Sequence, residues 1–553
     1  MLLCVPWGWD AFWSREGGAE TRGVLGLFFA AILCFFTGGV FVRLGRGANM
    51  ERVYRKEAIA SVVLSWFLAI ILGATPYLFS GAERTPGERM SVADAIFESS
   101  SGLTTTGATV VAELEDSDSL PRTILFWRST THLVGGLGVM CFFVAFLGHG
   151  ARGKALLKLE HTLSGVVPIG KARPLAFTLM GIFSGLVVLC ALTYYCCGMT
   201  LYDAISHAFS TIALGGFSTR NDSIGYFDSS PEIKQVAFKC ALIFFMIVAG
   251  TNYWLLYWVA QGKPGKLFRD SEWRCYIVLL FVGSVLTLAF GLIKGDYNQI
   301  NLAETTRVYV KDAEREVETK NLDLEKRDVD EAPNKKNVES KSAEKDIDSI
   351  RANLWFKATY RSVFHIVSLA TGTGFVSERY ESWNATSLTI ILIMMVIGGC
   401  GGSAAGGIKV FRVIYAWKAA ARYMERLYNP NVVRAAWLDG EIVKKDALDK
   451  AIVYIATFIV LINATAMLVI AVEPDDLWIN EGASQVDKAY DLTSGALAMF
   501  ANVGPAFGAL GSFDNYGALS DFTKIVFAFA ALLGRLEIWI VLAIFTPGFW
   551  KRN

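Results

Sequence analysis

The chain has 553 residues, of which 53% are hydrophobic and 13% aromatic, a composition far more apolar than that of ordinary soluble proteins. We therefore predict a polytopic membrane protein. Its formal net charge of +1 gives no reason to expect a nucleic-acid partner, and no basic patch with interleaved aromatic residues suggests one.

The N-terminal region, residues 1–56, contains one convincing membrane span at Val24–Val42, preceded by an interfacial stretch rich in tryptophan. Several arginines and lysines follow this span. A cluster of basic residues in a short loop marks the cytoplasmic side of a membrane protein. We therefore expect the amino terminus to lie outside and the next span, Ala58–Phe79, to run outward.

A short helix is predicted after that outward span. Val92–Leu103 has helical spacing, but a dozen residues cannot cross about 30 Å of hydrocarbon. The stretch ends at the turn Thr104-Thr105-Thr106-Gly107-Ala108-Thr109. The sequence therefore predicts a re-entrant helix that leads into a turn rich in threonine and glycine.

The same plan recurs three more times, and such repeats decide the fold. The later spans are predicted at Thr123–Leu147, Leu175–Cys197, Lys234–Val259, Cys275–Ile293, Thr386–Val413, Ile452–Val472 and Phe522–Phe545. The later short helices are predicted at Leu201–Ile212, Thr359–Ala370 and Lys488–Phe500, and the turns at Ala213–Thr219, Thr371–Ser377 and Ala501–Pro505. All basic loops then fall on one side, which predicts a cytoplasmic C-terminus.

We expect an all-α membrane protein with four fused helix–pore loop–helix repeats and one preceding helix. The repeats are predicted at 57–150, 151–262, 263–424 and 425–553. The third contains a segment at 304–351 that is dense in lysine, glutamate and aspartate and is expected to be a solvated insertion on the outer face. A regulatory role for it is left open.

The four turns have a common chemical use. Irregular backbone at membrane depth is tolerated only where water or an ion meets its carbonyl groups. Four such strands around one axis would give rings of carbonyl oxygens, which replace the hydration shell of a cation. The C-terminal ends of the short helices would favour a cation there as well. The turns contain no acidic residue, so neutral dipoles would select a weakly hydrated monovalent ion.

The sequence resembles the Trk/Ktr/HKT superfamily of potassium transporters, and most closely the bacterial Trk-type membrane subunit. The motifs that carry the resemblance are Asp94–Thr109, Phe209–Thr219, Gly398–Lys409, Asn502–Pro505 and Leu533–Glu537. The resemblance implies potassium uptake through a selectivity filter whose backbone carbonyls bind K⁺. The filter residues that it implies are Thr105, Thr106, Gly107, Gly215, Gly216, Thr373, Gly374, Asn502, Val503 and Gly504. In this superfamily a serine in place of Gly107 goes with sodium preference, so Gly107 favours potassium.

A gate is implied just below the filter. The glycine-rich stretch 398–407 interrupts the predicted span Thr386–Val413, and its exposed backbone should lie against the pore. The resemblance implies an intramembrane gating loop here, with Gly401, Gly402 and Ser403, and implies that Arg535 faces the pore and contacts this loop. The alternative is that Arg535 is a helix-end arginine that pairs with Glu537 or extends to the membrane surface.

Partners and location also follow from the resemblance. It implies a homodimer in the plasma (inner) membrane on a cytosolic nucleotide-binding ring protein, with K⁺ as the transported ion and no organic cofactor on this chain. Trk-type subunits usually have two helices before the repeats, whereas Val24–Val42 alone precedes them here.

Three alternatives remain beside potassium uptake. The first is a Na⁺-conducting or Na⁺/H⁺-coupled transporter with the same fold, and in this sequence only Gly107 distinguishes potassium uptake from it. A non-conducting membrane sensor could use the same fold. An intramembrane enzyme could pair His207 with Ser206 or Ser210, but no partnering aspartate is apparent, and we do not expect an enzyme.

Overall fold

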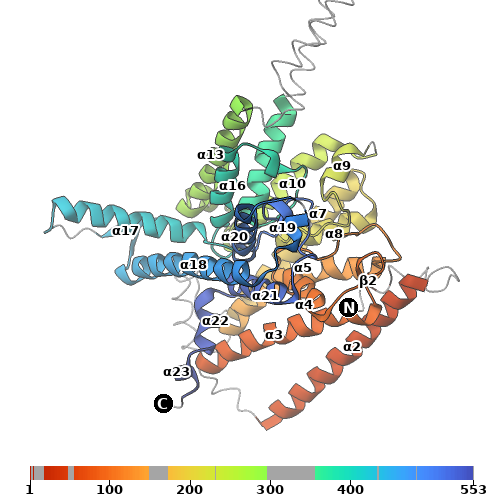
Figure 1. Cartoon of the computed structure of the whole chain (residues 1–553). Helices are drawn as coiled ribbons and strands as arrows, with labels where there is room; N and C mark the ends of the chain where they lie inside the picture. Colours follow the sequence, from red (N-terminus) through yellow and green to blue (C-terminus); the bar gives the residue numbers. More distant parts are fainter. Residues whose placement is uncertain are drawn as a thin grey trace, which may run out of the picture.

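The computed structural model describes residues 1, 4, 6, 18–47, 55–147, 172–230, 232–294, 355–431, 435–480 and 482–551. The basic loop at 151–171 and the insertion 304–351 lie outside these residues. Helices make up most of the described part, which also contains two short hairpins (Figure 1). Five helices are long and apolar enough to cross a membrane, and two bent helix pairs raise the number to seven.

The N-terminal helix α2 lies beside the first helix of repeat 1, at the edge of the molecule (Figure 1). It spans Gly18–Leu44, so it begins six residues before the predicted span Val24–Val42 and ends two residues after it, and the short 3-10 helix η2 (Gly45–Gly47) follows it. Its aromatic side chains Phe28, Phe35 and Phe36 are exposed, as expected of a surface that faces lipid.

Repeats 1 and 2 have the predicted order of span, short helix and return span. Repeat 1 consists of α3 (Arg55–Ser80), the hairpin β1 (Glu83–Thr85) and β2 (Glu88–Arg89), α4 (Val92–Leu103) and α5 (Arg122–Leu147). Repeat 2 consists of α7 (Ala172–Cys196), α8 (Leu201–Ala213), α9 (Gly225–Ser229), α10 (Gln235–Ala249) and α11 (Tyr253–Ala260). The short helices α4 and α8 lie where short helices were predicted, at Val92–Leu103 and Leu201–Ile212.

Repeats 3 and 4 follow the same order. Repeat 3 consists of α12 (Gly265–Arg269), α13 (Ser271–Lys294), a helix at 355–371, η6 (Tyr380–Ser382), α16 (Ala385–Val396) and α17 (Val410–Tyr428). Repeat 4 consists of β3 (Ala436–Leu438), β4 (Glu441–Val443), α18 (Lys445–Val472), α19 (Asp476–Asn480), α20 (Gln485–Ala501), η7 (Gly508–Leu510), α21 (Asp521–Arg535), α22 (Ile538–Ile544) and α23 (Pro547–Trp550).

Two predicted continuous spans are broken in the structure. Lys234–Val259 divides into α10 and α11, which are bent by 109°, and Phe522–Phe545 divides into α21 and α22, which are bent by 117°. Polar or charged residues lie at both breaks, Gly250–Asn252 and Arg535–Glu537, but the apolar runs on either side are long enough to predict one continuous span each. The first break contains Asn252, whose side chain caps α11 by accepting a hydrogen bond from the Trp254 amide (2.8 Å).

The basic segment after the third turn also differs from prediction. The predicted span Thr386–Val413 ends before Lys418, Arg422 and Arg426, but these basic residues lie on α17, which continues to Tyr428. Figure 1 shows α17 extending beyond the rest of the molecule beside α18. The predicted end of repeat 3 at residue 424 therefore falls inside a helix.

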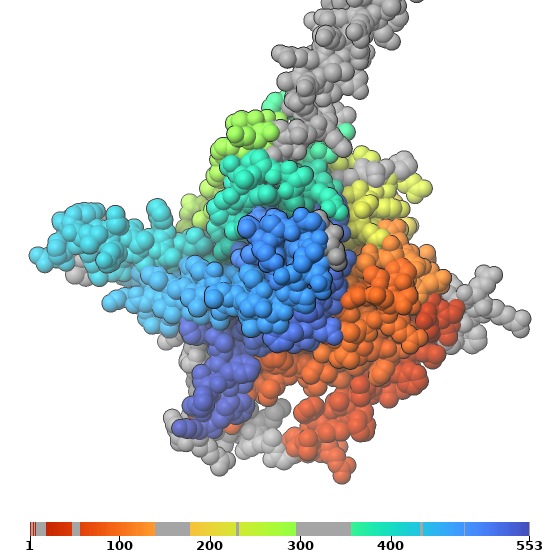
Figure 2. All heavy atoms as spheres, viewed as in Figure 1, coloured from red at the N-terminus to blue at the C-terminus, as the bar shows by residue number. Residues whose placement is uncertain are grey.

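The repeats surround a common centre. Residues of repeat 4 lie between those of repeat 3 and repeat 1 in the space-filling view (Figure 2). Contacts of α4 with α21 join the first repeat to the last. Many fully buried polar residues belong to the short helices and the turns that follow them, such as Thr104, Thr106, Thr371 and Thr373.

Candidate functional site: a ring of four turns

The four turns share one backbone conformation. Two residues before each predicted filter glycine, the chain adopts a positive φ, at Thr105 (53°), Leu214 (56°), Gly372 (77°) and Asn502 (53°). The filter glycines Gly107, Gly216, Gly374 and Gly504 also have positive φ angles, between 76° and 93°. Because this conformation is costly for residues with a Cβ, the three that adopt it without being glycine must be held by their surroundings.

The same hydrogen bond ends each short helix. The amide of the residue before the filter glycine donates to the carbonyl five residues earlier in all four repeats. These bonds are Thr106 to Ser101 (2.8 Å), Gly215 to Ser210 (2.8 Å), Thr373 to Ser368 (2.8 Å) and Val503 to Ala498 (3.0 Å). Such a bond reverses the chain at a helix C-terminus and leaves the last carbonyls directed beyond the helix end. Four turns with different side chains thus have one backbone geometry.

The turns contact one another in a closed cycle. A Cβ added to Gly107 would lie 2.5 Å or less from the carbonyl oxygen of Gly215, and the same holds for Gly216 with Thr373, Gly374 with Val503, and Gly504 with Thr106. Each contact joins one repeat to the next, and the last returns to the first. The carbonyl groups of Thr106, Gly215, Thr373 and Val503 therefore form a ring, and only glycine fits beside each of them.

The structure thus brings the predicted filter residues together, but at two levels along the chain: the ring of carbonyls and the residues just before it. Thr106, Gly215, Thr373 and Val503 supply the ring. Thr105 and Asn502 are one residue earlier, at the base of the ring. The Asn502 side chain donates to the Thr106 hydroxyl (2.9 Å) and to the Ala531 carbonyl (2.9 Å), which joins the turn of repeat 4 to that of repeat 1 and to α21.

A buried ion pair supports the ring from behind, and sequence analysis missed it. Arg128 on α5 contacts Glu98 on α4 (2.5 Å), and their side chains are 2% and 0% exposed. Glu98 also accepts a hydrogen bond from the Val110 amide (3.0 Å), and Arg128 donates to the Ser218 carbonyl (3.2 Å). The pair therefore links the extended segment after the first turn, at Val110, to the segment after the second turn, at Ser218.

Glu98 has counterparts in the other repeats. Nine residues before each filter glycine the sequence has Glu98, His207, His365 and Gly495. His207 contacts the Ser218 hydroxyl (3.0 Å), which contradicts a catalytic pairing with Ser206 or Ser210. Alignment of the four repeats on their glycines would have revealed these positions, although Arg128, on another element, would still have been missed.

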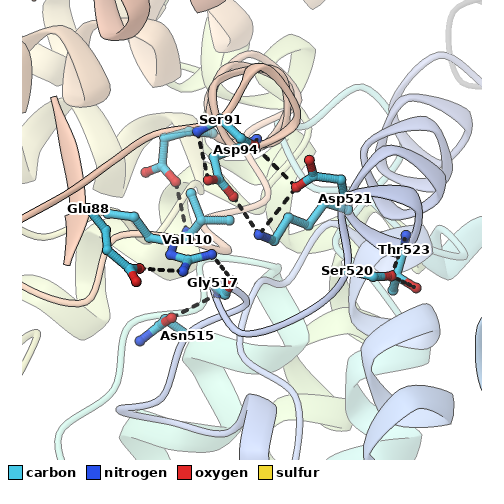
Figure 3. Close-up of polar contacts among 12 residues, drawn as sticks. Glu88, Ser91, Asp94, Val110, Asn515, Gly517, Ser520, Asp521 and Thr523 are labelled. Atoms are coloured by element: carbon cyan, nitrogen blue, oxygen red, sulfur yellow. Dashed lines mark hydrogen bonds and ion pairs between the residues drawn. The ribbon is translucent and has the colours of Figure 1, made fainter. Parts of the chain in front are cut away.

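A second buried ion pair closes the ring of repeats. Lys524 on α21 contacts Asp94 on α4 (2.6 Å), and both side chains are at most 3% exposed. Ser91, the N-cap of α4, also donates to Asp521 (3.1 Å), and Figure 3 shows Ser91 and Asp521 directed toward each other. Repeat 4 is thereby fixed against repeat 1 at the end of α4 that is remote from the turn.

A cavity of about 90 Å³ lies over the ring. Its lining includes all four filter glycines and loop residues such as Arg220 and Ser512. Ser512 donates through its hydroxyl to Glu381 (2.7 Å), which links the loops of repeats 3 and 4. Burial of Glu381 raises the pKa of its carboxyl above the ordinary 4.5.

The glycine-rich segment 398–407 lies on the opposite side of the ring, as a loop between α16 and α17. A parallel bridge between Ile397 and Ile408 closes its ends. Gly406 packs against the base of the fourth turn, where an added Cβ would lie 2.7 Å from Asn502 Oδ1. The predicted interruption of the span is confirmed, and the loop is in contact with the base of the ring.

Arg535 contacts this loop. Its guanidinium donates to the carbonyl of Ala404 (2.5 Å) and, more weakly, to that of Gly135 (3.5 Å). Glu537 pairs instead with Arg412 on α17 (2.6 Å), so the alternative pairing of Arg535 with Glu537 is wrong. Because Arg535 is the last residue of α21, it lies at a helix break rather than within a continuous span.

These features define a class of protein: a four-repeat membrane protein with one central ring of backbone carbonyls suited to a cation. The TrkH cation transport protein family model matches residues 28–548. The chain belongs to this family, which comprises transporters rather than enzymes.

Relatives and solved structures agree with this assignment. The Trk system potassium uptake protein TrkH of Salmonella typhimurium is 30% identical, with 93% of this chain and 92% of that protein covered. The protein of the same name from Halomonas elongata is 28% identical, with 93% and 90% covered. The crystal structure of the potassium transporter TrkH from Vibrio parahaemolyticus superimposes with a TM-score of 0.73 at 25% identity, with 100% of this chain and 98% of that chain covered.

Proposed function

We propose that this chain takes up K⁺ across the plasma (inner) membrane, as the membrane subunit of a larger transport system. The observation that carries the proposal is the closed ring of carbonyls from Thr106, Gly215, Thr373 and Val503. Neutral carbonyl dipoles can replace the hydration shell of a weakly hydrated monovalent cation, and no acidic side chain in the turns favours a divalent one. The names of the relatives, potassium uptake proteins, point the same way.

Transport would follow the axis of the ring. The cavity above the ring faces outward, K⁺ loses water as it enters the ring, and the loop 398–407 opens and closes the path below. The carbonyl of Ala404, held by Arg535, belongs to this loop, so the arginine adds a positive charge to the exit and stabilises the closed loop. Gly401, Gly402 and Ser403 form the mobile part of the gate.

We further propose the repeat division 57–150, 151–262, 263–428 and 429–553, since α17 ends at Tyr428. The basic residues of α17 would face the cytoplasm, with the C-terminus on the same side. There the subunit would pair with a second copy and bind a cytosolic nucleotide-binding ring. Coupling to H⁺ or Na⁺ remains an alternative to passive conduction.

Growth rescue tests the proposal. Expression of the chain in a strain that lacks its potassium uptake systems should restore growth at low K⁺, and Gly107→Ser should lower the preference for K⁺ over Na⁺ in uptake measurements. A well-expressed wild-type chain that fails to rescue growth would contradict potassium uptake. Ion-dependent flux in liposomes would exclude a non-conducting sensor, and equal Na⁺ and K⁺ uptake would favour the Na⁺-conducting alternative.

A further inference from the structure

Glu272 is an acidic residue in an apolar span. It is the second residue of α13, a helix long and apolar enough to cross a membrane, and it is only 6% exposed. A buried carboxylate requires hydrogen-bond donors to offset its desolvation. The groups that donate hydrogen bonds to Glu272 therefore indicate which parts of the structure this residue holds together.

Two backbone amides of the third repeat supply those donors. Glu272 Oε1 accepts hydrogen bonds from the amides of Gly401 (2.6 Å) and Phe411 (3.2 Å). Gly401 is in the intramembrane loop, and Phe411 is the second residue of α17. One oxygen atom thus joins the loop to the helix that follows it.

The position at α17 is favourable for an anion. The amides at a helix N-terminus lack partners within the helix, and the helix dipole makes this end positive. Lys409 occupies the N-cap position, and a lysine side chain has no acceptor to offer. Glu272 therefore supplies the cap of α17 from another helix.

Backbone contacts hold the rest of the loop against repeat 2. The Cys400 amide donates to the Gly250 carbonyl (2.9 Å), and the Tyr253 amide donates to the Gly402 carbonyl (3.2 Å). The loop is thus held between the broken span of repeat 2 and α13. Movement of Gly401 away from α13 would leave the Glu272 carboxylate buried with fewer donors.

We propose that Glu272 is a positioning residue that holds the intramembrane loop in its closed position through the amides of Gly401 and Phe411. This inference rests on the proposed function only where it concerns transport. Removal of the carboxyl group should lower the free energy of loop opening, because the open state no longer contains a buried acceptor that has lost its donors.

Cys400 provides a direct measure of loop opening, because its thiol is fully buried in the closed loop. The full-length protein in liposomes is treated with N-ethylmaleimide, and modification of each cysteine is followed over time by peptide mass spectrometry. Cys190, fully buried in repeat 2, reports global unfolding in the same sample. Glu272→Ala should speed modification of Cys400 about tenfold or more while Cys190 stays protected.

Two further variants sharpen the test. Glu272→Gln keeps an acceptor oxygen without the charge, so its Cys400 rate should lie between those of wild type and Glu272→Ala. Asp270→Asn is the matched control, because Asp270 caps the Trp273 amide (2.8 Å) and an asparagine can keep that bond. Its Cys400 rate should equal that of wild type.

An unchanged Cys400 rate in Glu272→Ala would overturn the inference. So would a parallel rise at Cys190 in both Glu272 variants, since the effect would then be on the whole fold. Uptake of K⁺ by the same liposomes separates the two proposals. Faster Cys400 modification with unchanged uptake supports the role of Glu272 and contradicts the loop as the gate.

Discussion

At the scale of single residues, the pair formed by Glu98 and Arg128 shows how charge can support a filter without facing the ion. Both side chains are buried, and further hydrogen bonds join Glu98 to Val110 after the first turn and Arg128 to Ser218 after the second turn. The Arg128 guanidinium also lies 3.9 Å from the ring centre of Phe217, which follows the second filter glycine. The pair fixes the position of two strands while it leaves the ring neutral.

Removal of one partner should therefore be far worse than removal of both. Arg128→Met leaves Glu98 buried without its charge partner, and we expect the free energy of unfolding to fall by about 3–5 kcal/mol. The double variant Glu98→Leu/Arg128→Met should be more stable than Arg128→Met alone. Thermal unfolding of the purified protein measures both effects.

The control is an exposed pair of the same charge type. Lys450 and Asp446 lie one turn apart on α18, with side chains 50% and 72% exposed. Lys450→Met should change the free energy of unfolding by less than about 1 kcal/mol. A loss of similar size in Lys450→Met and Arg128→Met would contradict the supporting role.

At the scale of elements, the short helices could be predicted well and the broken spans could not. Val92–Leu103 has the predicted bounds because Ser91 caps its start and the threonine turn ends it. The break between α21 and α22 is marked in the sequence only by the charged residues Arg535 and Glu537, which do not by themselves predict the positive φ of 66° at Glu537. Its partner Arg412 is 125 residues away, so the contact that stabilises the break is invisible in local sequence.

The candidate site likewise has features that the sequence could predict and features that it could not. The turns could be predicted because four similar motifs recur at equivalent places. The contacts behind them, such as Arg128 with Glu98 and Glu272 with Gly401, could not, because each joins elements that only the fold brings together. Arg535 was predicted to contact the loop through the resemblance alone.

The intramembrane loop offers a steric test at this scale. Gly406→Ala would place a methyl group against Asn502 at the base of the ring. Overpacking of this kind costs about 1–3 kcal/mol, and here it would destabilise the closed conformation of the loop relative to the open one. We expect K⁺ uptake into liposomes to rise by about 5- to 150-fold.

A glycine in open surroundings provides the comparison. Gly181 on α7 has no atom within 4 Å of an added Cβ, so Gly181→Ala should transport at the wild-type rate. Wild-type uptake in Gly406→Ala would show that the contact between loop and ring does not limit transport.

At the scale of the whole molecule, four different sequences form one cyclic structure. The filter glycines are preceded by Thr106, Gly215, Thr373 and Val503, yet each contacts the following repeat in the same manner. The side chains of the four turns differ, so the symmetry belongs to the backbone. This is why glycine is the shared residue.

The cyclic geometry makes the four glycines equivalent in function. Alanine at Gly107, Gly216, Gly374 or Gly504 would place a Cβ against a ring carbonyl and would add about 1–2 kcal/mol for its positive φ. We expect each single variant to lose K⁺ uptake to a similar extent in the growth assay. Full rescue by any one of the four alanine variants would refute the equivalence.

The contacts that close the ring also determine when a conducting path can exist during biosynthesis. The hydrogen bond from Asn502 to Thr106 joins residues 396 apart in sequence, and the ion pair of Lys524 with Asp94 joins residues 430 apart. Contacts of such long range form late and slowly. A nascent chain that has inserted three repeats still has an open side where the fourth belongs. The ring of carbonyls is therefore complete only when the helices of repeat 4 have joined the other three repeats.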